Sequence, residues 1–155
     1  MEAIARQFAN DARVLVIRNG WFSYRWSQIM DAGDLASHTT VLAASQSEDS
    51  TDAPFAPHPL DEILARIRAE KPDVVFCPHV ETSAGMMVPD EFIRAVTDCV
   101  HEHGGMFVLD CVASGTVFVN LKDTGVDVLL TAPQKGWSAS PCAALVMMSP
   151  HARAR

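Results

Sequence analysis

Apolar and polar positions follow two patterns that alternate along the chain, one typical of strands and one of helices. Short continuous apolar runs rich in β-branched residues, such as residues 14–17, are typical of buried parallel strands. Between them lie segments such as the one beginning at Leu60, in which apolar residues recur at i, i+3, i+4 and i+7, as on one face of a helix. The chain is therefore predicted to have an α/β fold.

The elements predicted in this way form one alternating series. Strands are expected over residues 14–17, 38–43, 73–77, 106–109, 126–130 and 143–148. Helices are expected over residues 3–8, 21–31, 60–71 and 89–103. Residues 45–59 are rich in Ser, Asp, Thr and Pro and are expected to form a surface loop. The series predicts a mostly parallel sheet with helices on both faces, and no internal repeat or second domain is visible.

Composition and charge narrow the class of protein. Hydrophobic residues make up 48% of the 155 residues and charged residues 20%, which is ordinary for a globular domain. The net charge of −7 comes without a basic stripe, so we expect no nucleic-acid partner. No apolar run approaches the roughly 20 residues that span a bilayer, and residues 1–13 lack the apolar core of a signal peptide. These features predict a cytoplasmic protein with no membrane partner.

The four cysteines are widely spaced, and no Cys-x-x-Cys pair occurs. A zinc site is therefore not expected, and no metal ligands are predicted. Each cysteine follows apolar or strand-like residues, which predicts buried free thiols in a reducing compartment. These are Cys77, Cys99, Cys111 and Cys142.

Polar and aromatic residues gather where the predicted strands end. Ligands of open α/β sheets bind beyond the carboxyl ends of the strands. There, an aromatic ring, hydroxyl groups, a carboxylate and a lysine are expected to converge on one crevice. The segments that supply them are Asn19–Phe22, His79–Gly85, Asp110–Gly115 and Thr131–Trp137.

Asp110 and Lys135 are the main candidates for chemistry. Asp110 directly follows an apolar strand, where a carboxylate needs a partner to offset its desolvation. It either caps the following turn or binds a protonated heterocyclic nitrogen, as the ring of an electron-sink cofactor requires. Lys135 is either a surface charge or, in a segment with little other charge, an amine that bonds covalently to a carbonyl group.

The other strand-end residues also allow two interpretations. The polar residues of segment 79–83 either bond to the local backbone or orient groups of a bound cofactor. Phe22, like its neighbour Trp21, is either a core aromatic or a ring that stacks on a flat ligand. Each signal is weak alone, whereas their order and spacing together are specific.

Three motifs occur in a characteristic order. They are His-x-Glu-Thr-Ser-x-Gly at 79–85, a strand ending in Asp110 with Ser-Gly soon after it, and Pro-Gln-Lys-Gly-Trp at 133–137. Together they resemble the class V aminotransferases of the fold-type-I superfamily, most of all the alanine–glyoxylate and serine–glyoxylate group, over nearly the whole chain. No Gly-x-Gly-x-x-Gly follows a strand, so a Rossmann dinucleotide site is not expected.

The resemblance assigns a role to five residues. Lys135 matches the lysine that binds pyridoxal phosphate covalently, and Asp110 matches the aspartate that bonds the pyridine nitrogen. Thr82 matches a hydroxyl residue that contacts the cofactor. Phe22 matches the aromatic residue that stacks on the ring, and Gln134 matches a glutamine near the cofactor phosphate.

The same resemblance implies a function and an assembly. It implies a pyridoxal-phosphate-dependent transaminase that moves an amino group between a small amino acid and a 2-keto acid, of the alanine/serine–glyoxylate or pyruvate type. The intact enzyme would be a homodimer with its active sites at the interface. Residues 1–155 would be the central part of the large domain, without the phosphate-binding turn before it and the small domain after it. The last strand, 143–148, is expected to run antiparallel.

Departures from the family pattern leave two other functions open. Ser140-Pro141-Cys142 replaces the usual Pro-Pro-Gly, and Ser83-Ala84-Gly85 replaces Ser-Thr-Gly. A lyase or desulfurase on the same scaffold is disfavoured, because Lys135 lacks the preceding His of a Thr-x-His-Lys pattern. A truncated, non-catalytic α/β module is favoured by the short chain and disfavoured by the complete set of five cofactor residues.

Overall fold

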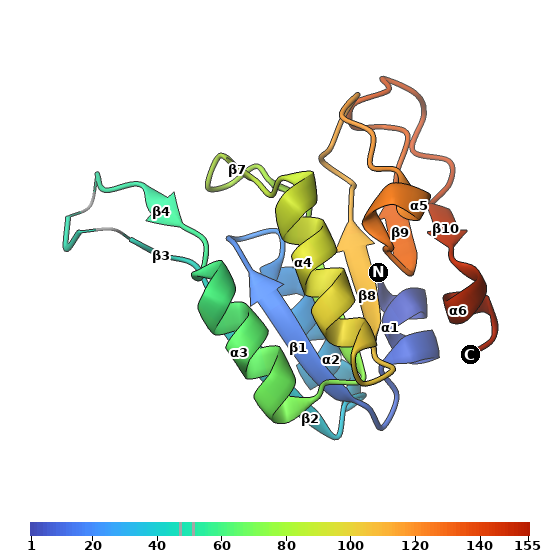
Figure 1. The fold of residues 1–155 in the computed structure, drawn as a ribbon. Helices are drawn as coiled ribbons and strands as arrows, with labels where there is room; N and C mark the ends of the chain where they lie inside the picture. Colours follow the sequence, from blue (N-terminus) through green and yellow to red (C-terminus); the bar gives the residue numbers. More distant parts are fainter. Residues whose placement is uncertain (47, 51) are drawn as a thin grey trace.

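A computed structural model describes residues 1–46, 48–50 and 52–155 and shows one central sheet with helices packed against it (Figure 1). The sheet has six strands in the order β10-β9-β8-β5-β1-β2. Their bounds are β1 (Arg13–Arg18), β2 (His38–Ala43), β5 (Val74–Pro78), β8 (Met106–Asp110), β9 (Val128–Thr131) and β10 (Leu145–Met148). Neighbouring strands pair in parallel except β10, which is antiparallel to β9. The predicted mostly parallel sheet and the antiparallel final strand are confirmed.

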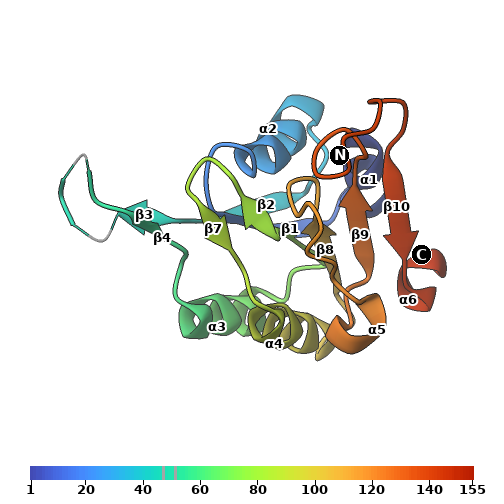
Figure 2. The same ribbon diagram turned by 90° about the horizontal axis from the view of Figure 1, so that it is seen from above.

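Helices cover both faces of the sheet, as predicted (Figure 2). One face carries α3 (Leu60–Glu70), α4 (Asp90–His101) and α5 (Leu121–Thr124). The other carries α1 (Glu2–Phe8) and α2 (Tyr24–Gly33). A last short helix, α6 (Pro150–Arg153), follows β10 and buries Ala152 in the same core cluster as α1 and α2.

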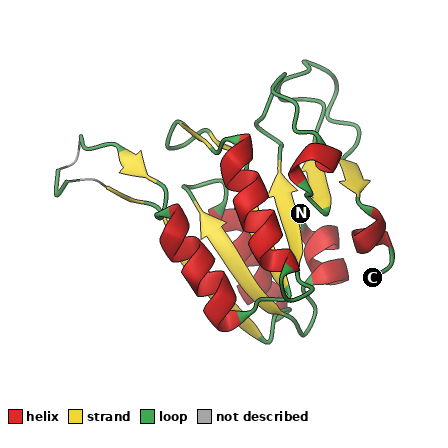
Figure 3. Cartoon of the chain, in the orientation of Figure 1, coloured by secondary structure: helices red, strands yellow, loops and turns green. Residues whose placement is uncertain are grey.

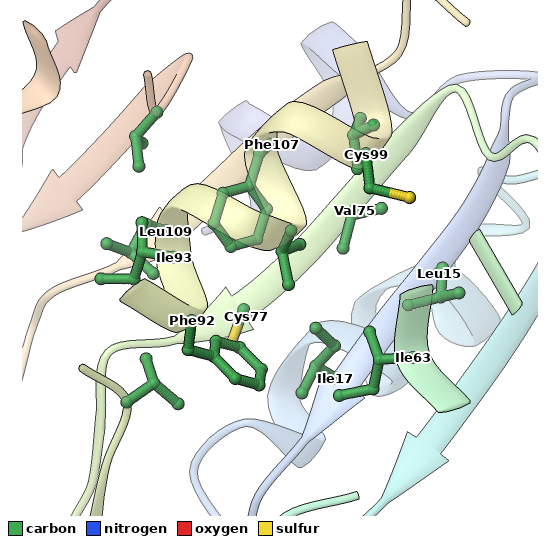
Figure 4. Packing of buried hydrophobic residues seen from close by; sticks show 14 of the residues in the cluster. Leu15, Ile17, Ile63, Val75, Cys77, Phe92, Ile93, Cys99, Phe107 and Leu109 are labelled. Carbon is green, nitrogen blue, oxygen red and sulfur yellow. The ribbon is translucent and has the colours of Figure 1, made fainter. Parts of the chain in front are cut away.

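The side-chain alternation of the central strands explains the two cores. In β1, Leu15 and Ile17 face α3 and α4, whereas Val14 and Val16 face α1 and α2. Figure 4 shows the first of these cores, where Ile17 and Phe107 lie close to side chains from the helices. A strand covered on both faces has no polar side, so its sequence reads as a continuous apolar run. Each such buried side chain contributes about 1.5–3 kcal/mol.

Several short elements lie inside segments predicted as loops. Two small antiparallel hairpins occur, β3 (Ser45–Gln46) with β4 (Phe55–Ala56), and β6 (Val80–Glu81) with β7 (Met86–Met87). The first lies in the predicted loop 45–59, of which residues 47 and 51 are outside the described part. The helices α5 and α6, drawn red in Figure 3, were also not predicted, since four residues are too few for an apolar period.

Two expectations about particular residues are corrected. The second helix begins at Tyr24 rather than at Trp21, because the preceding residues form a turn held by a buried carboxylate. All four cysteines are free, but Cys142 is exposed rather than buried, since it lies in the connection between β9 and β10. Among the described residues, no helix combines the length and the hydropathy needed to cross a bilayer.

Candidate active site

The carboxyl ends of four parallel strands, β1, β5, β8 and β9, lie at the same edge of the sheet. The loops that follow them surround a cavity of about 210 Å³. Four of the five predicted site residues line it, namely Phe22, Thr82, Asp110 and Lys135. Gln134 does not, since it precedes Lys135 with an exposed side chain outside the set of lining residues in the described chain. The other lining residues are Met1, Trp21, Ser23, Arg25, Pro78, Val80, Val112 and Ala113.

Asp110 ends β8 and presents its carboxylate to the cavity. Its Oδ2 accepts a hydrogen bond from the indole Nε1 of Trp26 at 3.2 Å, and its Oδ1 accepts one from the backbone N–H of Val112 at 3.1 Å. Burial raises the pKa of Asp110, and these two bonds counteract the rise in part. A cation bound in the cavity would therefore favour the ionised form of this carboxyl group.

Lys135 lies in the turn after β9, with its Nζ 5.9 Å from the centroid of the Phe22 ring. That distance is at the outer limit of a cation–π contact. The turn is fixed by Trp137, whose Nε1 donates to the backbone oxygen of Gly115 at 3.0 Å. Gly136 packs on the backbone of Gly115 so closely that no side chain would fit there. These contacts place the lysine at the cavity although its own segment has no regular structure.

Glu81 organises the aromatic side of the cavity. The side chain is 1% exposed and accepts bonds from the backbone N–H groups of Phe22 and Ser23, at 3.2 and 2.9 Å. The hydroxyl groups of Ser23 and Ser83 also donate to it, at 2.7 and 2.6 Å. Burial alone would raise the pKa of Glu81, but these donors lower it below the ordinary value. A side chain on Gly20 would collide with Glu81 and Ser83, so glycine permits this close approach.

One further contact joins neighbouring loops. The Nδ1 of buried His79 lies 2.7 Å from the hydroxyl of Ser114, and burial lowers the pKa of this histidine. The bonds to Glu81 link the loop after β1 to the loop after β5, and the His79–Ser114 contact links the loop after β5 to the loop after β8. The Trp137–Gly115 bond links the loop after β8 to the loop after β9. We call these three contacts the loop ties. The thiol of Cys111 is buried, and burial raises its pKa to about 12, so it is a poor nucleophile.

Replacing Glu81 with glutamine is expected to lower the free energy of unfolding by about 2–3 kcal/mol at pH 7, since the donors bonded to the replaced oxygen lose a charged acceptor. Because the folded pKa of Glu81 is depressed, its stabilisation is present above the unfolded pKa of about 4.3 and is lost as the pH falls through the folded value. Urea unfolding at pH 7 and at about pH 4 measures both effects. The loss should be smaller at the lower pH.

Glu62→Gln is the matched control, since the Glu62 side chain is 61% exposed on α3. It should change the unfolding free energy by less than about 0.5 kcal/mol. Equal losses in the two variants would contradict the role given to Glu81.

Two partners in the site were not predicted from the sequence. Trp26 was assigned to a helix, and its bond to Asp110 joins residues 84 positions apart. The signal was present, since a buried indole N–H needs an acceptor and a strand-end carboxylate needs a donor. Arg25 also lines the cavity, although nothing in its sequence surroundings distinguishes it from a surface arginine.

Comparison with known proteins shows what this chain resembles. No family model matches the chain. L-Aspartate–glyoxylate aminotransferase of Paracoccus denitrificans is 29% identical over 151 residues, which are 97% of this chain and 36% of that protein. The crystal structure of alanine–glyoxylate aminotransferase from Nostoc sp. covers 99% of this chain and 38% of its own, with a TM-score of 0.78 and 26% identity. The chain is similar, over nearly its whole length, to class V aminotransferases.

One similar protein has a name of another kind. It is called soluble hydrogenase, small subunit, of Synechococcus sp. (strain PCC 6716), and is 31% identical over 90% of this chain and 34% of its own length. The aminotransferase names agree better with a lysine and a strand-end carboxylate around one cavity. Class V aminotransferases are pyridoxal-phosphate enzymes of fold type I. The chain spans about a third of the length of the curated relatives it matches.

Proposed function

We propose that this chain forms the cofactor-binding part of a pyridoxal-phosphate-dependent transaminase, within the large domain of that enzyme. One observation carries the proposal: Asp110 and Lys135, 25 residues apart in sequence, line the same cavity together with the ring of Phe22. A surface lysine and a turn-capping aspartate would have no reason to share a cavity with an exposed aromatic ring.

The residues present fit pyridoxal phosphate. The raised pKa of Asp110 favours a cationic partner, and a protonated pyridine nitrogen is one. Phe22, 54% exposed, offers an apolar ring to a flat ligand at the cavity, and its loop is held by Glu81. The Thr82 side chain, also at the cavity, offers a hydroxyl group. When bound, the cofactor supplies an aldehyde that condenses with amines and a ring that withdraws electrons.

Each side chain then has a defined task. Asp110 would keep a proton on the pyridine nitrogen of the cofactor by charge-assisted hydrogen bonding. The Nζ amine of Lys135 would hold the cofactor covalently and would also serve as the base that moves the proton of the donor's Cα atom. Phe22 covers the ring and excludes water. Glu81 acts only by fixing the loop that carries Phe22.

We propose a small amino acid as donor and glyoxylate or pyruvate as acceptor. The names of the similar proteins support this choice, because they include glyoxylate aminotransferases and 2-aminoethylphosphonate–pyruvate transaminases. Gln134 is proposed to lie near the cofactor phosphate, as in the family motif.

The proposal extends to assembly and location. Trp21 and Phe118, 74% and 76% exposed, add to Phe22 as large apolar side chains left open to solvent. Exposed apolar surface of this kind supports a homodimer. The four free thiols support a cytoplasmic location.

A half-reaction tests the proposed function. The chain is loaded with pyridoxal phosphate, freed of excess cofactor and given L-alanine, L-serine or L-aspartate without any keto acid. A transaminase should release up to one equivalent of keto acid per bound cofactor and no ammonia, and added glyoxylate should then yield glycine. Release of ammonia from L-serine would instead identify a lyase, and formation of alanine from added L-cysteine would identify a desulfurase. No product from any donor in the loaded protein would contradict catalysis by this chain.

A further inference from the structure

A second group of side chains with metal-ligating atoms lies at the opposite edge of the sheet from the cavity. His101 ends α4, Asp127 directly precedes β9, and His151 lies in α6. The Nε2 of His101 is 2.8 Å from Oδ2 of Asp127, and the Nδ1 of His151 is 3.1 Å from Oδ1. One ligand atom from each residue lies within 4.8 Å of the other two.

We propose that His101, Asp127 and His151 bind a divalent transition metal ion of the zinc type. Imidazole nitrogens and a carboxylate oxygen are ligands that zinc takes, and this donor set does not suit magnesium or calcium, which prefer oxygen. Three protein ligands with an open side fit a tetrahedral ion whose fourth position holds water. The group contains no cysteine, so the spacing argument made for the cysteines does not bear on it.

The carboxylate is held in place for this task. Asp127 is 1% exposed, and the backbone N–H of Phe107 donates to its Oδ2 at 2.9 Å. The hydroxyl of Ser149 donates to its Oδ1 at 2.9 Å. Hydrogen bonds from such outer groups orient metal ligands and contribute to metal affinity.

These two donors also weigh against a purely structural explanation of the histidines. Each oxygen of Asp127 already accepts a hydrogen bond from Phe107 or Ser149, so the buried carboxylate has partners without any imidazole. The burial of Asp127 therefore does not by itself explain why two histidines lie beside it. Each instead presents a ring nitrogen to the carboxylate from the solvent side, with its side chain 36% (His101) or 41% (His151) exposed.

The adjustment needed to bind an ion is small. Zinc–nitrogen bonds of about 2.0–2.1 Å place two ligands of a tetrahedral ion roughly 3.4 Å apart. The ligand atoms, within 4.8 Å of one another, would close by about 1 Å or a little more through ring rotation. Both rings are open to solvent on one side and meet edge to face, with centroids 5.6 Å apart. An ion held there would fasten α6 to α4 and to the start of β9.

Zinc titration of the untagged 155-residue chain tests the proposal, in a Cys142→Ser background that removes the exposed thiol. Calorimetry with zinc chloride should show one equivalent bound. His101→Gln and His151→Gln should each weaken the affinity at least tenfold. His58→Gln is the matched control, since His58 is partly exposed beside Glu62 and far in sequence from the group. It should bind as the parent does.

A second readout identifies the ligands and the state of the fold. Cobalt(II) in place of zinc should give the visible absorption of a four-coordinate nitrogen and oxygen site, without a thiolate charge-transfer band. Zinc should raise the Tm of the parent and of His58→Gln, but not that of His151→Gln. Circular dichroism confirms that the variants fold. Absence of a saturable equivalent, unchanged affinity in both histidine variants, or a thiolate band would each overturn the proposal. None of these results depends on the cofactor chemistry.

Discussion

Replacing Lys135 with alanine should abolish the covalent attachment of pyridoxal phosphate that borohydride makes permanent. The chain has only three lysines, Lys71, Lys122 and Lys135, and only Lys135 lines the cavity. An amine beside the bound cofactor reacts at a high effective concentration, whereas the other lysines react only from bulk solution. We expect one cofactor per chain at Lys135 and none above background in Lys135→Ala, measured by intact mass and peptide mapping.

Lys122→Ala is the matched control, since Lys122 lies in α5, outside the set of residues that line the cavity. It should label as the parent does. The amino group of Met1 is a competing site because Met1 also lines the cavity, and peptide mapping separates it from Lys135. Labelling confined to Met1, or spread evenly over the lysines, would contradict the assignment.

Asp110→Asn should slow the amino-donor half-reaction by on the order of 10²–10³-fold, as when a fixed electrostatic partner is removed from a reacting group. Asparagine has nearly the same shape but does not keep a proton on the pyridine nitrogen. The free energy of unfolding should change by less than about 1 kcal/mol, because one lost hydrogen bond is offset by removal of a carboxylate that burial disfavours. Stopped-flow absorbance measures the rate, and urea unfolding the stability.

The pH dependence of the unfolding free energy provides a second test of the same variant. The pKa of Asp110 is raised in the folded protein, so its ionised form destabilises the fold above the unfolded pKa of about 3.9. Asp110→Asn should therefore be more stable relative to the parent at neutral pH than at about pH 4. Asp98→Asn, an exposed position on α4, controls for removal of one charge. If the rate is unchanged in Asp110→Asn, Asp110 does not hold the pyridine nitrogen.

The sequence predicted the long elements well because their cores are repetitive. Strand β2 has the predicted bounds, and the predictions for β1, β5 and β8 differ by one residue at each end or less. Such strands are covered on both faces, so hydrophobicity alone marks them. The hairpin β6–β7 was not predicted, because two-residue strands leave no pattern and Glu81 of β6 is bonded to the distant Phe22 and Ser23.

The site was predicted in part, and the division has a physical cause. Strand-end position placed Asp110 and Lys135 at one edge of the sheet, since the end of a parallel strand is visible in the sequence. Trp26 was missed as the partner of Asp110, because a contact between a helix and a strand end depends on how they pack. Cys142 was assigned to the interior from its apolar neighbours, yet those neighbours are exposed as well.

The loop ties make the stability of the loops around the cavity cooperative. Glu81, the His79–Ser114 pair and the Trp137–Gly115 bond connect loops that start from four different strands. Substitutions in two ties should therefore not have additive effects, since breaking the first frees groups on which the second depends. The whole rim would open as one cooperative unit at a free energy below that of global unfolding. A change of substrate preference by mutation thus has to preserve the ties before it can alter the cavity.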